Sequence, residues 1–185
     1  MRIITGKYKG RTLIAPKSQT RPTLDRTKET LFNILNPLIP DCVALDLFAG
    51  SGQLALECLS RNASRVILCD NSRDAVQAIN CNFQKVGETP ELFFCDYSQC
   101  LARLQDEKVD LVFVDPPYKS GVYSDVLKKL QENRVVKNGG VVVCEHSADI
   151  PLPLQEGKFS VYDRRKIGTV QFSFYRCDAN SMEEK

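Results

Sequence analysis

Four consecutive residues, Asp115, Pro116, Pro117 and Tyr118, have the clearest potential for chemistry, and they follow the apolar run 109–114. A strand that runs into two prolines ends on a rigid loop, although a turn capped by Asp115 is the plainer alternative. The Asp115 carboxylate and the Pro116 carbonyl could accept both hydrogens of an exocyclic amine, directing its lone pair at an electrophilic methyl group. Tyr118 could stack on the ring that carries the amine. The loop therefore predicts chemistry on a nucleic-acid base.

A glycine-rich loop after an earlier apolar strand indicates a cofactor site. Gly50 and Gly52 allow a close approach between the backbone and a ligand at the carboxyl end of the strand. The segment 50–55 also fits a dinucleotide-binding fingerprint, with Asp70 at a suitable distance for a ribose. Asp46, however, ends the strand just before the loop, where its carboxylate would repel a pyrophosphate but could hold the ammonium of a methionine moiety. Together with the Asp115 loop, this disfavours NAD.

Three acids are expected at the carboxyl ends of three successive strands. Besides Asp46, these are Asp70, whose two oxygens could accept both ribose hydroxyls, and Asp96, which could accept a hydrogen bond from an adenine amino group. Taken singly, each is equally well explained as a helix cap or turn residue. Their convergence on one edge of a sheet predicts an adenosine-binding site. We include three neighbours in this expected site: Phe48, Asn71 and Tyr97.

The elements that must position these residues alternate along the chain. Apolar runs predict strands near 42–47, 65–69, 92–95, 109–114 and 140–145. Helical spacing predicts helices near 53–61, 72–86, 98–105 and 121–133, and a helix opened by Pro22 and stopped by Pro37 and Pro40. A final antiparallel hairpin is expected over 159–163 and 169–175. This α/β order predicts a mostly parallel, seven-stranded sheet with helices on both faces.

The first forty residues differ from the rest in charge. Residues 1–15 alternate around Gly6 and Gly10 and predict a β-hairpin. Residues 1–28 hold eight basic side chains and one acid, a net +7; since the chain totals +2, the remainder is −5. Such a basic segment suits a phosphate backbone, with a solvated basic face as the alternative. The candidates for RNA binding are Arg2, Lys7, Lys9, Arg11, Arg21, Arg26 and Lys28, with Arg164, Arg165 and Lys166 on the last hairpin as a possible second contact.

Composition excludes several other classes of protein. No apolar run is long enough to cross a bilayer and no signal peptide is evident, so we expect a cytoplasmic protein with no membrane partner. The eight cysteines show no Cys-x-x-Cys pair and only one histidine is present, so we expect reduced core cysteines and no metal. We expect an N-terminal extension over 1–40, a catalytic domain over 41–177 and a disordered tail over 178–185, all in a single globular unit.

With these motifs in place, the chain resembles the Rossmann-like, class I S-adenosylmethionine-dependent methyltransferases. The segments 1–4, 6–11, 21–29 and 31–33 narrow the match to the bacterial RsmD-like family of 16S ribosomal RNA (guanine-N2)-methyltransferases, over residues 1–176. The resemblance implies S-adenosylmethionine as cofactor, S-adenosylhomocysteine as product and 16S RNA in an assembling small subunit as substrate. It implies cofactor roles for Asp46, Gly50, Gly52, Asp70 and Asp96, and substrate roles for Asp115, Pro116 and Tyr118. We expect a monomer.

The chain departs from the family at Gln53, Ala55 and Asn62, where small residues or glycine are usual, and at Asp70, where glutamate is commoner. Four other functions stay open, of which a protein-glutamine methyltransferase is disfavoured because such enzymes usually carry Asn in place of Asp115. A DNA adenine-N6 methyltransferase would suit the Asp115 loop, but the chain has no obvious target-recognition domain. A non-catalytic RNA-binding assembly factor could retain the scaffold, and an NAD oxidoreductase is a more distant alternative.

Overall fold

The computed structural model describes residues 1–17, 25–117 and 121–178. Within these ranges the chain forms two compact units, the first ending at Asp96 and the second beginning at Tyr97. The predicted N-terminal extension, residues 1–40, lies within the first unit. Pro22, Arg21, Tyr118 and residues 179–185 of the predicted tail fall outside the described residues.

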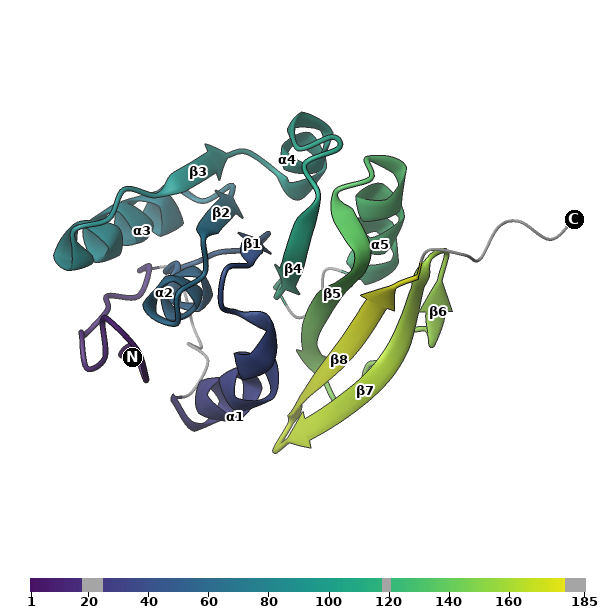
Figure 1. Cartoon of the computed structure of the whole chain (residues 1–185), viewed down its shortest axis with the longest axis horizontal. Helices are drawn as coiled ribbons and strands as arrows, with labels where there is room; N and C mark the ends of the chain where they lie inside the picture. The colour runs from purple at the N-terminus through teal and green to yellow at the C-terminus, as the bar shows by residue number, and fades with distance from the viewer. Residues whose placement is uncertain (18–24, 118–120, 179–185) are drawn as a thin grey trace, which may run out of the picture. The chain divides into compact units, whose positions relative to one another are not determined.

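The first unit is built on three parallel strands in the order β3-β2-β1 (Figure 1). The strands are β1 (Val43–Asp46), β2 (Arg65–Asp70) and β3 (Glu91–Phe94), and the helices are α1 (Asp25–Leu35), α2 (Gln53–Ser60) and α3 (Arg73–Val86), with a short 3-10 helix over Asn36–Leu38. α2 packs against β1 and β2. β2 is buried along its centre, as expected of a parallel strand covered by helices. The predicted strands and helices of this unit are confirmed to within a few residues.

The predicted N-terminal hairpin is reduced to a single antiparallel bridge between Arg2 and Thr12. Ile3 N donates to Arg11 O at 3.0 Å and Gly10 N donates to Ile3 O at 2.8 Å, so the segment does fold back on itself. Gly6 explains why it stays a loop: its φ is +88°, and a Cβ there would overlap the Ser60 backbone of α2. The segment is shaped by contact with α2 rather than by strand pairing.

A buried cluster of charged side chains connects the N-terminal segment to α1 and α2. Lys28 of α1 and Glu57 of α2 both have fully buried side chains, and Lys28 Nζ lies 3.1 Å from Glu57 Oε1. Arg61 Nε lies 3.5 Å from Glu57 Oε2. Ile4 N donates to Glu57 Oε1 at 2.6 Å, and Lys28 Nζ also donates to Arg2 O. One carboxylate therefore joins the N-terminal loop, α1 and α2.

The second unit contains strands in the order β4-β5-β8-β7-β6. They are β4 (Val109–Val114), β5 (Val136–Ser147), β6 (Gln155–Glu156), β7 (Phe159–Ile167) and β8 (Val170–Cys177), with helices α4 (Tyr97–Arg103) and α5 (Tyr123–Glu132). β4 and β5 are parallel, whereas β8, β7 and β6 continue in antiparallel order. Figure 1 shows β7 and β8 as a long hairpin with the short β6 beside β7.

Three strands of this unit differ from the prediction, and one of them is β7, which continues to Ile167 rather than ending at residue 163. β5 begins at Val136 rather than near residue 140. Val109 of β4 pairs with Val136, and the register then shifts so that Leu111 pairs with Val141. The Gly139-Gly140 pair lies in this irregular part and interrupts the apolar run, so the first residues of the strand were not predicted. β6 makes eight strands among the described residues, where seven were expected. It has only two residues, too few for an alternating pattern to reveal.

All eight cysteines are free thiols, and seven are buried, as expected of core residues; Cys81 is exposed. Among the described residues, no helix is long and apolar enough to cross a membrane.

The Glu57 cluster leads to a stability prediction. Glu57→Gln removes the charge but keeps the shape, and it leaves Lys28 and Arg61 buried beside a neutral group. We expect the free energy of unfolding in urea to fall by about 3–5 kcal/mol. Glu91→Gln is the matched control, because the Arg65–Glu91 pair at 2.6 Å is about 40% exposed on each side and should contribute less than about 1 kcal/mol. Equal losses in the two variants would contradict this assignment.

Candidate functional site

Asp70, at the end of β2, holds the glycine-rich loop in place. Its Oδ2 accepts from Gly50 N at 2.8 Å, and its Oδ1 accepts from Ser72 N at 2.8 Å. The sequence predicted these oxygens as acceptors for ribose hydroxyls; in the structure they also accept backbone hydrogens. A carboxylate has about four lone-pair sites, so each oxygen keeps capacity for a ligand. Asp70 therefore holds the loop in shape, and its role toward a ribose stays a prediction.

The glycines adopt backbone conformations that explain their presence. Gly50 has a φ of +54° and Gly52 a φ of +73°, both in the left-handed region that favours glycine. A Cβ at Gly52 would lie 3.2 to 3.3 Å from Phe83, Ile79 and Leu68, so a larger residue would also crowd the helix behind the loop. The loop passes directly into α2 at Gln53.

The three predicted acids lie at one edge of the first unit. Asp46 is the last residue of β1 and Asp70 the last of β2, while Asp96 follows β3 by two residues. The register staggers them, since Asp46 pairs with Leu68, two residues before Asp70, and Asp70 pairs with Phe94, two residues before Asp96. Asp46 is buried, Asp70 is half-buried and Asp96 is exposed. Of the other predicted cofactor residues, Phe48 is half-buried and Asn71 is exposed.

Gln53, which the sequence marked only as a departure from the family, has a buried acceptor at this loop. The residue is 5% exposed, and its Oε1 atom finds no hydrogen-bond donor among the described residues. A buried carbonyl without a partner is costly unless a ligand supplies the hydrogen. This acceptor, the strand-end acids and the glycine backbone fit a cofactor that carries hydroxyls and a positive charge, such as S-adenosylmethionine.

Asn82 is a residue that the sequence prediction missed. It lies on the buried face of α3, where its Nδ2 donates at 2.9 Å to both Ser51 O and Ile14 O. Its Oδ1 accepts from Ile14 N at 2.9 Å. One amide thus joins the glycine loop to the N-terminal segment. The available signal was a polar residue at an apolar position of the helix, between Ile79 and Phe83.

The second unit carries the predicted catalytic loop. Asp115 directly follows the buried strand β4, and Pro116 is buried while Pro117 is exposed. Burial raises the pKa of the Asp115 carboxyl to about 7. A group that titrates near neutral pH can accept a proton and release it again, as a reacting acid or base requires. Tyr118, predicted to stack on the base, lies outside the described residues, so its role stays a prediction.

Tyr97, a predicted cofactor residue, and His146 both form hydrogen bonds within this unit. Tyr97 OH donates to Asp125 Oδ2 at 2.8 Å, which joins α4 to α5. His146, to which the sequence gave no role, is buried with its ring nitrogens 2.9 Å from Ser147 O and from Ser173 Oγ. Burial lowers the pKa of His146. These contacts describe a packed, neutral histidine.

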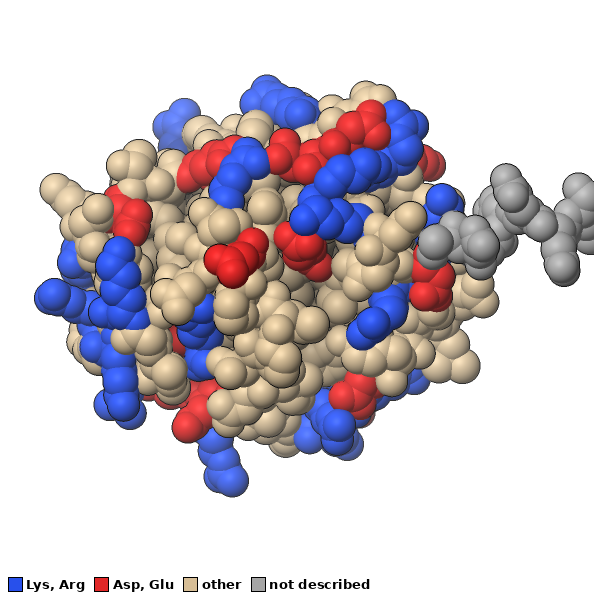
Figure 2. Space-filling view, in the orientation of Figure 1, with Lys and Arg blue, Asp and Glu red and all other residues tan. Residues whose placement is uncertain are grey.

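The basic N-terminal residues divide into two groups. Lys9, Arg11 and Arg26 are exposed, and Figure 2 shows blue side chains gathered at the left of the view, where Figure 1 places the N-terminal segment. Arg2 and Lys7 are also exposed but lie 3.4 Å from Asp25 and Glu88 respectively. Arg21 lies outside the described residues.

The prediction that Lys28 contacts RNA is corrected by the structure. Its side chain is fully buried against Glu57, so it is unavailable to a phosphate group. On β7, by contrast, the predicted second contact is exposed at Arg164, Arg165 and Lys166. Arg164 donates to Leu152 O at 2.8 Å and Arg165 pairs with Asp163 at 3.0 Å.

Comparison with known proteins places this geometry in a family. The family model described as "Conserved hypothetical protein 95" matches residues 1–176. Ribosomal RNA small subunit methyltransferase D of Escherichia coli (strain K12) is 32% identical over 180 residues, covering 97% of this chain and 91% of the relative. The solved structure of the Escherichia coli protein yhhF has a TM-score of 0.82 at 33% identity, covering 97% of this chain and 99% of that one.

A more distant structure shares the fold alone. SMU.776, solved as a complex with SAH, has a TM-score of 0.69 at 12% identity and covers 84% of this chain and 50% of that one. Its likeness confirms the α/β methyltransferase fold predicted from the strand order. The match over residues 1–176 shows that this chain belongs to the "Conserved hypothetical protein 95" family, the RsmD family of methyltransferases that its motifs resemble.

Proposed function

We propose that this protein transfers a methyl group from S-adenosylmethionine to the exocyclic N2 of a guanine in 16S ribosomal RNA within an assembling small subunit. The observation that carries the proposal is the position of Asp115, directly after the buried strand β4 and before two prolines. The Escherichia coli relative, by its name, methylates small-subunit ribosomal RNA, which supports the class of substrate.

The chemistry asked of Asp115 follows from the electronic structure of the amine. The lone pair of guanine N2 is delocalised into the ring, so the nitrogen is a weak nucleophile. As a carboxylate, Asp115 would accept one amino hydrogen, and the Pro116 carbonyl would accept the other, which localises the lone pair on nitrogen. After transfer the amine is strongly acidic. Asp115 or water then accepts the proton, and the raised pKa of this carboxyl suits that step.

The first unit supplies the groups that would bind the cofactor. S-adenosylmethionine, when bound, supplies a methyl group on a positively charged sulfonium. Asp70 would accept ribose hydroxyls while it holds Gly50, Asp96 would accept from the adenine amine, and Asp46 would hold the methionine ammonium. The buried Gln53 Oε1 offers one further acceptor at this loop.

The test of this function identifies the methylated nucleoside. Purified protein is incubated with radiolabelled S-adenosylmethionine and unmethylated small subunits, naked 16S RNA or duplex DNA, and the products are digested to nucleosides. Label in N2-methylguanosine supports the proposal, and the substrate that accepts label identifies the assembly state. Label in N6-methyladenine of DNA would overturn it, and absence of label with retained RNA binding would favour an assembly factor.

The raised pKa of Asp115 predicts a pH dependence. The carboxyl keeps its proton until pH approaches 7, and the proposed role needs the ionised form, so kcat/KM should rise with pH and level off above about 7. Asp115→Asn should lower kcat by about 100-fold or more and remove this rise, while calorimetry shows nearly unchanged binding of S-adenosylmethionine. Asp70→Ala is the control and should weaken cofactor binding first. An unchanged pH profile in Asp115→Asn would contradict the assigned role.

The exposed N-terminal cations predict the salt dependence of RNA binding. Lys9→Glu combined with Arg11→Glu removes two exposed cations for which no acidic partner is seen among the described residues. The slope of log K against log salt should become less negative by about 1.4 to 1.8 for a 16S RNA fragment in filter-binding assays. Lys128→Glu, an exposed residue of α5, should leave the slope unchanged. If both variants give the wild-type slope, the N-terminal segment does not bind RNA.

A further inference from the structure

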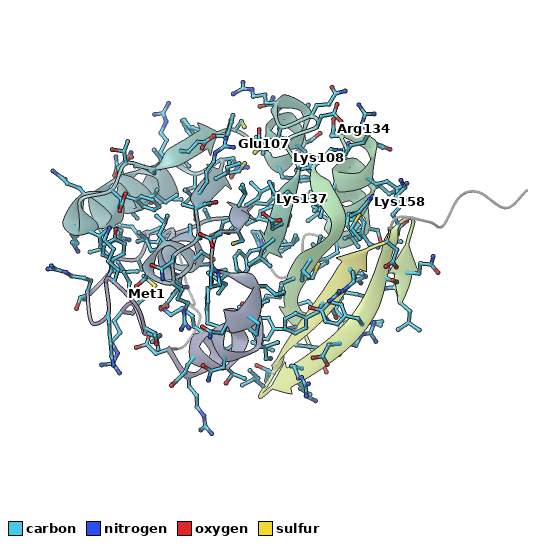
Figure 3. All side chains as sticks on the ribbon, viewed as in Figure 1. Met1, Glu107, Lys108, Arg134, Lys137 and Lys158 are labelled. Carbon is cyan, nitrogen blue, oxygen red and sulfur yellow. The ribbon has the colours of Figure 1, made fainter. Side chains whose placement is uncertain are left out.

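A cavity of about 240 Å³ lies in the second unit, at the amino ends of β4 and β5. Three cationic side chains line it, those of Lys108, Arg134 and Lys158, and no acidic residue is found among the described lining residues. Figure 3 shows these three residues at the same end of the unit. The lining also includes Leu130, Val136 and Phe159, whose side chains are buried. The cavity therefore combines positive charge with apolar residues in its wall.

The backbone that carries two of these cations is strained. Lys108 has a φ of +64° and Arg134 a φ of +50°, and Asp106 nearby has a φ of +63°. A left-handed conformation costs about 1–2 kcal/mol for a residue with a Cβ. Hydrogen bonds hold this geometry: Asp106 N donates to Asn133 O at 2.9 Å, and Lys108 Nζ donates to Arg134 O at 3.2 Å. Strain of this kind, maintained by surrounding contacts, tends to occur at functional sites.

The third cation is fixed from the other side of the cavity. Lys158 N donates to Gln131 Oε1 of α5 at 2.6 Å, and Asp178 N donates to Lys158 O at 2.9 Å. Gly157 has a φ of +56°, and a Cβ there would overlap the Gln131 side chain. The turn that presents Lys158 is thus held tightly against α5. The backbone of Lys158 is therefore preorganised.

The charges around the cavity leave a positive balance. Arg134 donates two hydrogen bonds to the Asp106 carboxylate in a bidentate pair, at 2.6 and 2.7 Å. This pair holds the pKa of Asp106 below its usual value. Lys108 lies 3.7 Å from the same carboxylate. Burial raises the pKa of the Cys177 thiol at the cavity wall, and the charge of Asp178 raises it further. The charges of Lys158 and Lys108 lower it. Asp106, Glu107 and Asp178 lie near these cations in the chain or in space, but the charged residues that line the cavity itself, among those described, are the three cations.

We propose that this cavity binds a phosphate ester about the size of one nucleotide, with the phosphate between Lys158 and Lys108 and the organic part against the rest of the lining. Lysine ammonium groups bind phosphate as point charges, and the Arg134 guanidinium keeps donors beyond those that contact Asp106. The volume is below that of a pocket for a drug-sized ligand, which excludes a dinucleotide.

This site is separate from the proposed methyl-transfer chemistry. Lys108 directly precedes β4 and Asp115 directly follows it, and a strand of six residues spans about 20 Å. A phosphate ester bound here would not contact Asp115. The ligand could be a nucleotide of the substrate RNA or a free phosphorylated metabolite, since both present the same phosphate chemistry.

The test uses the full chain labelled with nitrogen-15 and saturated with S-adenosylhomocysteine, so that the cofactor site is occupied. Uridine 5′-monophosphate is the probe, because uracil has no exocyclic amine for Asp115 to hold, and uridine is the matched ligand without phosphate. We expect amide shifts at Lys108, Arg134 and Lys158 with the monophosphate and not with uridine. Lys158→Gln should weaken binding at least tenfold. Lys137→Gln should leave it unchanged, because Lys137 pairs with Asp110 at 2.8 Å and does not line the cavity.

RNA-binding assays on the same variants distinguish the two sources of phosphate. If Lys158→Gln weakens binding of a 16S RNA fragment and lowers the salt slope by about one, the ligand is an RNA nucleotide. If RNA binding is unchanged while the monophosphate is lost, the ligand is a free phosphate ester. Shifts that are absent, or that persist in Lys158→Gln, would overturn the proposal. Failure of methyl transfer by the wild-type protein would leave this result untouched.

Discussion

The first unit depends on one buried carboxylate, that of Glu57. Taking an acid out of water is expensive, and the cost is offset only by close ion pairs and hydrogen bonds. Here Lys28, Arg61 and the Ile4 amide provide them from three separate segments. Because Glu57 lies one turn into α2, the helix that follows the glycine-rich loop, the same interaction sets the position of the exposed basic segment relative to that loop. Asn82 makes a second connection between these two parts.

Strand-end acids serve structure and chemistry together. Asp70 is held by the backbone hydrogens of Gly50 and Ser72, so it is already oriented before any ligand arrives. A site with fixed acceptors loses less freedom on binding than one that must order itself. Glycine at positions 50 and 52 makes this possible, because the loop needs positive φ angles that other residues adopt only with strain.

Much of the fold and part of the candidate site were predictable because they follow local rules. Buried parallel strands are continuous apolar runs, so the ends of the strands could be located, and Asp46, Asp70 and Asp115 do lie at or directly after the ends of their own strands. The N-terminal hairpin was wrong because contact between Gly6 and Ser60 is a tertiary effect. Lys28 was wrong for a related reason: a count of charges cannot tell a solvated lysine from one paired inside the protein.

The proposed catalytic loop could be located from sequence, but the pKa of its aspartate could not be predicted. From sequence alone an aspartate would be assigned its ordinary pKa. Burial raises the pKa of Asp115 to about 7, so that the acid and its carboxylate are both populated near neutral pH. An aspartate of ordinary pKa would hold the amine but would be a poor proton acceptor, and a permanently protonated one could not take up the proton that the amine releases. A positive charge brought close to Asp115 favours its ionised form. In the proposed reaction, a nearby sulfonium would therefore favour the carboxylate form of Asp115, which accepts the amino hydrogen. After the methyl group is transferred, burial would act on Asp115 without that charge and would favour uptake of the proton.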